Sequence, residues 1–130
     1  MRLLLDTHVF LWFISGDNRL SGDLRQLIQD GRNEILLSVV SVWETIVKYQ
    51  LGRLPLPESP HVYIPKQRAR HSIDSLPLDE ASVSQLASLP PLHRDPFDRM
   101  LICQAKQFSL TIVTEDPSIL AYPVATTKEG

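Results

Sequence analysis

Four acidic residues of this sequence stand where an expected strand gives way to a helix, or where a helix begins. They are Asp6, Glu44, Asp98 and Asp116. In an open parallel sheet the carboxyl ends of the strands meet at one edge, and ligands bind there. Two unit charges about 4 Å apart repel by roughly 4 kcal/mol at an effective dielectric near 20. Carboxylates gathered at that edge therefore need a divalent cation, and an all-oxygen ligand set suits Mg²⁺ or Mn²⁺.

A divalent cation held by carboxylates points to chemistry on phosphate. Such an ion polarises a phosphoryl oxygen and lowers the pKa of a bound water, which then becomes a nucleophile. With two ions, the attacking and the leaving oxygen would both be stabilised, and the sequence leaves open whether one ion binds or two. The chain has no glycine-rich phosphate loop, zinc-type Cys/His cluster or Gly-x-Ser-x-Gly elbow, so those chemistries have no support.

Each acidic residue also has a local explanation as part of a helix cap. The segment Ser41–Glu44 fits a capping box, in which the glutamate bonds back to the backbone N–H of the serine. Asp95 and Asp116 each precede a proline and fit N-cap positions, and Asp98 would then face the positive end of its helix. Capping explains the acids one at a time, but it gives no reason for acids to recur at successive strand ends. We therefore interpret the set as a candidate metal site.

Strand-like and helix-like segments alternate along the chain. This pattern favours a three-layer α/β/α fold with a mostly parallel sheet of four to five strands. Strands are expected at residues 2–6, 34–37, 73–78 and 110–114, with a last edge strand at 124–126. Helices are expected at residues 7–16, 21–31, 41–49, 59–70, 79–89 and 96–108, with a turn or short helix from Pro117.

The bulk properties are those of an ordinary globular protein. At 130 residues and 14.7 kDa we expect a single domain over residues 1–130, with a flexible tail at 127–130. A formal charge of −2 does not indicate a strongly basic nucleic-acid binder, although a bound cation can reverse the local field. The single Cys103 suits a reducing compartment, and the N-terminal apolar run is far shorter than a membrane span. We expect a cytoplasmic protein with no membrane contact.

Taken together, the motifs of this chain resemble those of the PIN domain. Four segments carry the resemblance: Leu3–His8, Ser41–Glu44, Asp95–Arg99 and Thr114–Asp116. More narrowly, the chain resembles the VapC-type toxin of a bacterial type II toxin–antitoxin pair, over nearly its whole length. The resemblance implies a Mg²⁺- or Mn²⁺-dependent ribonuclease with strand order 3-2-1-4-5, which typically forms a homodimer and is silenced by a cognate antitoxin.

The same resemblance implies roles for individual residues. Asp6, Glu44, Asp98 and Asp116 become the quartet that holds the metal and carries catalysis, with Asp116 at the position that varies most in the family. Asp98 fits the third position because the family's aspartate directly precedes the apolar helix. The supporting residues are Thr114, which resembles the hydroxyl residue that accompanies the last acid, and Asp95, Thr7, Arg99 and His8.

Several alternatives remain open at this point. Arg94 and Arg99 could hold phosphate oxygens or form ion pairs with nearby acids. His8 could position the substrate or make only local hydrogen bonds. Two other functions are a phosphoacceptor signalling domain, which would normally have paired acids after the first strand, and a PIN-like module that has lost catalysis and only binds a partner.

Overall fold

The computed structural model describes residues 1–127, and a four-stranded parallel sheet lies at its centre. The strand order is β3-β2-β1-β4, which confirms the expected order 3-2-1-4. The strands are β1 (Arg2–Leu5), β2 (Glu34–Ser38), β3 (Asp74–Leu76) and β4 (Thr111–Val113). Beyond β4, Ile112 and Thr126 form one parallel bridge, so the expected fifth strand is reduced to that bridge.

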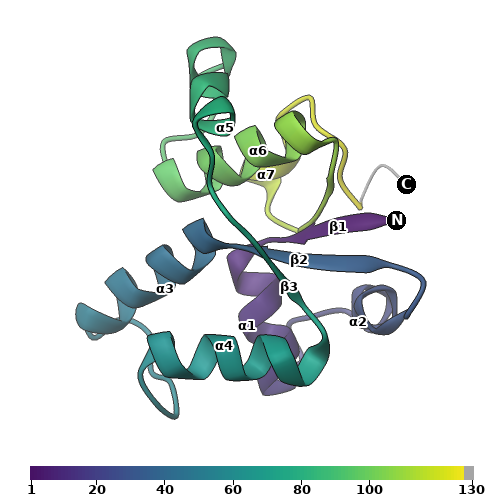
Figure 1. The fold of residues 1–130 in the computed structure, drawn as a ribbon, viewed down its shortest axis with the longest axis vertical. Helices are drawn as coiled ribbons and strands as arrows, with labels where there is room; N and C mark the ends of the chain where they lie inside the picture. Colours follow the sequence, from purple (N-terminus) through teal and green to yellow (C-terminus); the bar gives the residue numbers. More distant parts are fainter. Residues whose placement is uncertain (128–130) are drawn as a thin grey trace.

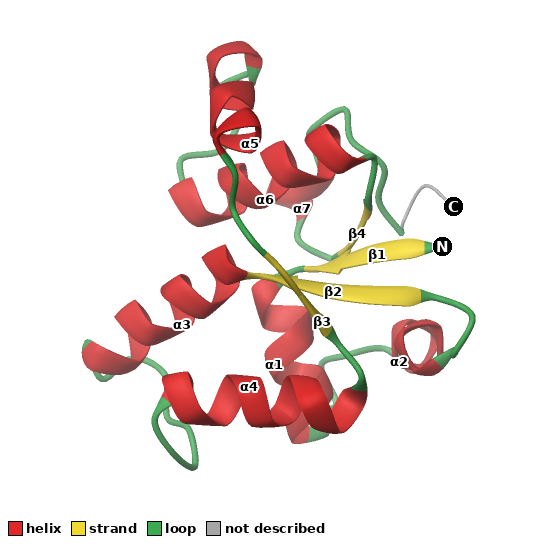
Figure 2. Cartoon of the chain, viewed as in Figure 1, coloured by secondary structure: helices red, strands yellow, loops and turns green. Residues whose placement is uncertain are grey.

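Helices cover both faces of the sheet, which confirms the three-layer α/β fold (Figure 1, Figure 2). One face carries α1 (Thr7–Ser15), α2 (Gly22–Gln29) and α4 (Pro60–His71). The other carries α5 (Glu80–Ser84), the 3-10 turn η1 (Gln85–Ser88), α6 (Pro96–Phe108) and α7 (Pro117–Leu120). The remaining helix, α3 (Val39–Gln50), continues directly from the carboxyl end of β2.

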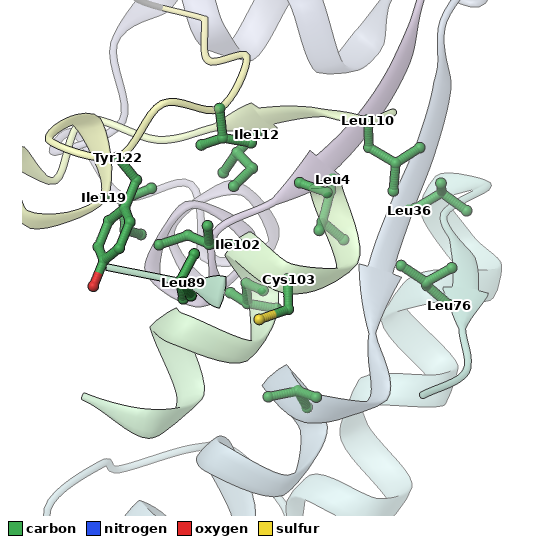
Figure 3. Packing of buried hydrophobic residues seen from close by; sticks show 14 residues of the cluster. Leu4, Leu36, Leu76, Leu89, Ile102, Cys103, Leu110, Ile112, Ile119 and Tyr122 are labelled. Carbon is green, nitrogen blue, oxygen red and sulfur yellow. The ribbon is translucent and has the colours of Figure 1, made fainter. Parts of the chain in front are cut away.

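The strand side chains alternate between two apolar cores, as the two-residue period of a strand requires. Leu4, Leu36 and Ile112 belong to the core beneath α6, and Figure 3 shows them with Ile102 and Cys103 of that helix. The neighbouring residues along the strands belong to the opposite core, on the side of α1, α2 and α4. These residues are Leu3, Leu5, Ile35, Leu37 and Val113. Both faces of β1 are thus buried.

The start of α3 differs from the prediction. The helix begins at Val39, because the hydroxyl of Ser38 accepts the backbone N–H of Val40 at 3.0 Å and caps it. The expected capping box at Ser41–Glu44 is therefore wrong. Since Glu44 lies in the second turn of the helix, its carboxylate does not cap the helix start.

The other boundaries shift by small amounts. The helix expected at residues 79–89 divides into α5 and the 3-10 turn, and β3 is shorter than the expected 73–78. Thr127 donates its backbone N–H to the carbonyl of Ile112 at 3.1 Å, and the rest of the expected tail lies outside the described residues. Within residues 1–127, none of the helices combines the length and the apolar character needed to cross a bilayer.

Candidate metal centre

Asp6 ends the central strand and is almost fully buried, with 3% of its surface exposed. It caps α1, because its Oδ1 accepts a hydrogen bond from the backbone N–H of His8 at 3.3 Å. Its other oxygen, Oδ2, accepts the hydroxyl of Thr114 at 2.8 Å. Burial raises the pKa of Asp6, while the bonds from Thr114 and His8 work in the opposite direction and the charge of Asp116 adds to the rise.

Glu44 approaches the same region from α3 and is 1% exposed. Its Oε2 accepts a hydrogen bond from the Nζ of Lys48 at 2.5 Å. Its Oε1 is buried and has no hydrogen-bond partner among residues 1–127. A buried carboxylate oxygen without a donor is costly, and a cation would remove that cost. Nearby, the hydroxyl of Thr7 donates to Ser41 Oγ at 2.7 Å, which ties the start of α1 to α3.

The entrance of α6 brings two more carboxylates and an imidazole together. Asp95 caps the helix, since its Oδ1 accepts the N–H groups of Phe97 at 2.8 Å and Asp98 at 3.3 Å. His93 Nε2 lies 2.9 Å from Asp98 Oδ2, and the His93 backbone N–H donates to Tyr122 Oη at 2.9 Å. His93, Asp95 and Asp98 each offer one possible metal-ligand atom, a ring nitrogen or a carboxylate oxygen. These three atoms lie within 4.8 Å of one another.

The electrostatics of Asp98 connect this entrance with the other two acids. Its pKa is raised to about 6, chiefly by burial; the hydrogen bond to His93 opposes the rise, and the charges of Asp95, Asp6 and Glu44 add to it. The charges of two other predicted acids, Asp6 and Glu44, thus reach Asp98. Among the described residues, however, only His93, Asp95 and Asp98 bring three ligand atoms within 4.8 Å. Asp6, Glu44 and Asp116 therefore do not belong to a set of three ligand atoms this close together.

Asp116 lies on the Asp6 side of the site. It is half-buried and caps α7, with its Oδ1 accepting the N–H of Ser118 at 2.9 Å. Its own N–H donates to the hydroxyl of Thr114 at 3.0 Å, so this threonine links the last acid to Asp6. The charge of Asp116 contributes to the raised pKa of Asp6.

The remaining predicted residues stand around this centre. His8 is exposed, and its ring centroid lies 6.0 Å from that of Trp12. Arg94 and Arg99 line a cavity of about 320 Å³ together with Trp43. Neither arginine forms an ion pair within residues 1–127, and the buried Nε of Arg99 has no partner there, so the ion-pair interpretation of these two residues is not realised.

Two residues of the site were missed in the sequence. Lys48 could have been found, since it follows Glu44 by four residues and side chains at that spacing lie on one helix face. His93 sits in the loop before α6, where no periodic pattern places a side chain. Its backbone N–H is held by a contact with Tyr122, 29 residues later.

Comparison with known proteins places this geometry in a wider group. Among curated proteins, Ribonuclease VapC16 of Mycobacterium tuberculosis (strain ATCC 25618 / H37Rv) is 42% identical over 59 residues. The match covers 45% of this chain and 42% of that protein, so the chain aligns with less than half of the relative's length.

Two solved structures share the fold over almost the whole chain. VapBC2 from Rickettsia felis, bound to a DNA fragment from its promoter, matches with a TM-score of 0.71 at 16% identity, over 97% of both chains. VapBC-1 from nontypeable Haemophilus influenzae matches with a TM-score of 0.68 at 14% identity, over 98% of this chain and 97% of that one. The family model described as PIN domain matches residues 3–124, and the chain therefore belongs to the PIN-domain family.

Proposed function

We propose that this chain is a Mg²⁺- or Mn²⁺-dependent endoribonuclease that hydrolyses RNA phosphodiester bonds as the toxin of a toxin–antitoxin pair. The observation that carries the proposal is the buried Glu44 Oε1, which lacks a partner among the described residues. It accompanies Asp98, whose pKa is raised by burial and by the charges of Asp95, Asp6 and Glu44. Membership of the PIN-domain family and the partial identity with Ribonuclease VapC16 support it.

The residues present fit a hard divalent cation. Asp6, Glu44 and Asp98 would hold it, with Asp116 at the Asp6 side, because all four offer oxygen donors that such ions prefer. When bound, the ion supplies Lewis-acid polarisation of the phosphate and a water of lowered pKa.

The protein's own contribution is to hold these carboxylates in place. Thr114 fixes one oxygen of Asp6, and His93 fixes one oxygen of Asp98. Such bonds orient metal ligands, and their loss typically reduces metal affinity or activity about 10- to 100-fold. On the substrate side, Arg99, whose buried Nε has no partner among residues 1–127, and its neighbour Arg94 would hold phosphate oxygens at the rim.

The partners follow from the same likeness. The two similar solved structures are named as VapBC assemblies, and we propose a cognate antitoxin for this chain in the cytoplasm.

We also propose a homodimer, because α3, α5 and the loop before α6 expose large apolar side chains. These are Trp43, Val83 and Leu92, which are 57%, 40% and 56% exposed.

The test is RNA cleavage by the purified chain, freed of any antitoxin. Cleavage should require Mg²⁺ or Mn²⁺ and stop with EDTA. Asp6→Asn and Asp98→Asn should stay folded, as judged by circular dichroism, and lose more than about 100-fold in rate, since even residues behind the ligands cost 10- to 100-fold. Asp74→Asn is the matched control, because Asp74 is exposed on β3 away from the site.

Two results would contradict the proposal. Cleavage at the normal rate by both Asp6→Asn and Asp98→Asn would show that the assigned residues are wrong. Cleavage that persists in EDTA would show that the activity does not depend on a divalent cation.

A further inference from the structure

The candidate metal centre already contains a positive charge of the protein's own. Lys48 follows Glu44 by one helical turn, and its ammonium lies 2.5 Å from Glu44 Oε2. The Glu44 side chain is 1% exposed, whereas that of Lys48 is 35% exposed. A buried carboxylate is therefore paired with an ammonium that sits at the rim, on a flexible stem that can swing outward.

This ion pair differs from the surface pairs of the protein. Lys66 and Glu58 approach to 2.6 Å, but their side chains are 61% and 37% exposed, so water screens their charges. Lys48 faces acids from two helices. Burial works against its charged form, yet the bond to Glu44 and the charges of Glu44, Asp95 and Asp98 leave the pKa of Lys48 raised.

The position of Lys48 conflicts with a metal ion on Glu44. One Glu44 oxygen is held by the ammonium, and the other is buried without a partner among residues 1–127. A divalent cation that engages this carboxylate would stand within a few ångströms of the ammonium. Like charges at that distance repel strongly where water is largely excluded. The two cations therefore compete for the same carboxylate.

We propose that Lys48 is an internal counter-ion of the metal centre, which neutralises Glu44 in the metal-free protein and leaves this carboxylate when a divalent cation binds. This inference rests on the proposed function. It has a regulatory consequence. The apparent metal affinity equals the intrinsic affinity multiplied by the fraction of molecules in which Lys48 does not hold Glu44. The centre then fills only at cation concentrations high enough to displace the lysine.

The experiment measures Mn²⁺ binding directly, by electron paramagnetic resonance of the free ion. Wild-type protein is compared with Lys48→Met, which keeps most of the apolar stem, and with Lys66→Met as the matched control. Lys48→Met should bind Mn²⁺ more tightly, on the order of tenfold, if about nine in ten wild-type molecules hold the pair. Lys66→Met should match the wild type. Thermal unfolding adds a second readout: Lys48→Met should be less stable than the wild type without metal, and this deficit should shrink at saturating Mn²⁺.

Salt separates displacement from simple repulsion. At 1 M KCl the screening length falls to about 3 Å, which removes long-range repulsion but affects a partly buried contact much less. The gain in Lys48→Met should therefore persist at 1 M KCl. Lys48→Gln, which can still donate a hydrogen bond to Glu44 without carrying charge, should show the same gain and serves if Lys48→Met folds poorly.

Each other outcome has a definite meaning. Equal or weaker Mn²⁺ binding by the Lys48 variants would overturn the counter-ion role and leave the proposed function standing. A gain that disappears at 1 M KCl would overturn displacement. Absence of Mn²⁺ binding to wild type and variants alike would overturn the proposed metal centre and this inference with it.

Discussion

Thr114 links two of the candidate metal ligands, and its hydroxyl can be removed with little change in shape. The residue is 0% exposed. Its Oγ1 donates to Asp6 Oδ2 at 2.8 Å and accepts the backbone N–H of Asp116 at 3.0 Å. Thr114→Val replaces the hydroxyl with a methyl group of similar size, so both bonds are lost while the packing is kept.

The expected cost follows from these two bonds. A hydrogen bond to a charged group contributes about 1.5–3 kcal/mol, and one between neutral groups about 0.5–1.5 kcal/mol. Thr114→Val should therefore lower the free energy of unfolding by about 2–4.5 kcal/mol. The matched control is Thr45→Val: Thr45 is 1% exposed, and its hydroxyl donates only to the helical carbonyl of Ser41, at 2.7 Å. That change should cost no more than about 1 kcal/mol.

Urea unfolding followed by circular dichroism measures both variants, because a domain of this size usually unfolds in two states. Nuclear magnetic resonance of the Asp6 carboxyl carbon gives a second readout. The bond from Thr114 lowers the pKa of Asp6, so its loss should raise that pKa further. The reasoning is refuted if Thr114→Val and Thr45→Val are equally stable and the pKa of Asp6 does not move.

Three further predictions concern the cap of α3, the pH dependence and the oligomer. Ser38→Ala removes the cap on Val40 and the bond to Gln104, and should cost about 1–2 kcal/mol in thermal unfolding; an unchanged melting temperature would contradict this. Because the pKa of Asp98 is raised to about 6, the folded protein binds more protons than the unfolded chain above pH 4. With EDTA present, the unfolding free energy of the wild type relative to that of Asp98→Asn should fall from about pH 4 to about pH 6 and then level. A rise over that interval would contradict the raised pKa of Asp98. Trp43→Lys should convert the proposed dimer into a monomer in analytical ultracentrifugation, whereas the control Gln107→Lys should not.

The elements of the fold were largely predictable because their signals are local. The helix α6 runs from Pro96 to Phe108 as predicted, with an aspartate cap and a proline at its first position. The start of α3 was not predictable in this way. Ser38 and Ser41 are both good caps, and the β-branched pair between them reads as strand. The choice is made by a tertiary contact, since the Ser38 hydroxyl also donates to Gln104 at 2.5 Å, 66 residues away.

The candidate site was predictable only as a set of acids at strand ends and helix starts. The acids at strand ends were expected to gather, because parallel strands finish at one edge of the sheet. Their charges do act on one another at Asp98. Nothing in the spacing showed that Asp98 would share its carboxylate with His93, or that Asp116 would lie on the Asp6 side. The placement of His93 depends on the contact of its backbone N–H with Tyr122, in the segment after β4. The placement of Asp116 depends on its bond to Thr114.

Helix capping and metal binding are not competing explanations for these acids. A carboxylate has two oxygens, and the caps on α6 and α7 each use one of them: Oδ1 of Asp95 and Oδ1 of Asp116 accept backbone N–H groups. Their Oδ2 atoms take no hydrogen bond within the described residues. The cap fixes the direction of the second oxygen, since a carboxylate held at one end cannot rotate freely. For Asp116, whose helix follows β4, the cap would in this way orient the second oxygen for the proposed metal centre.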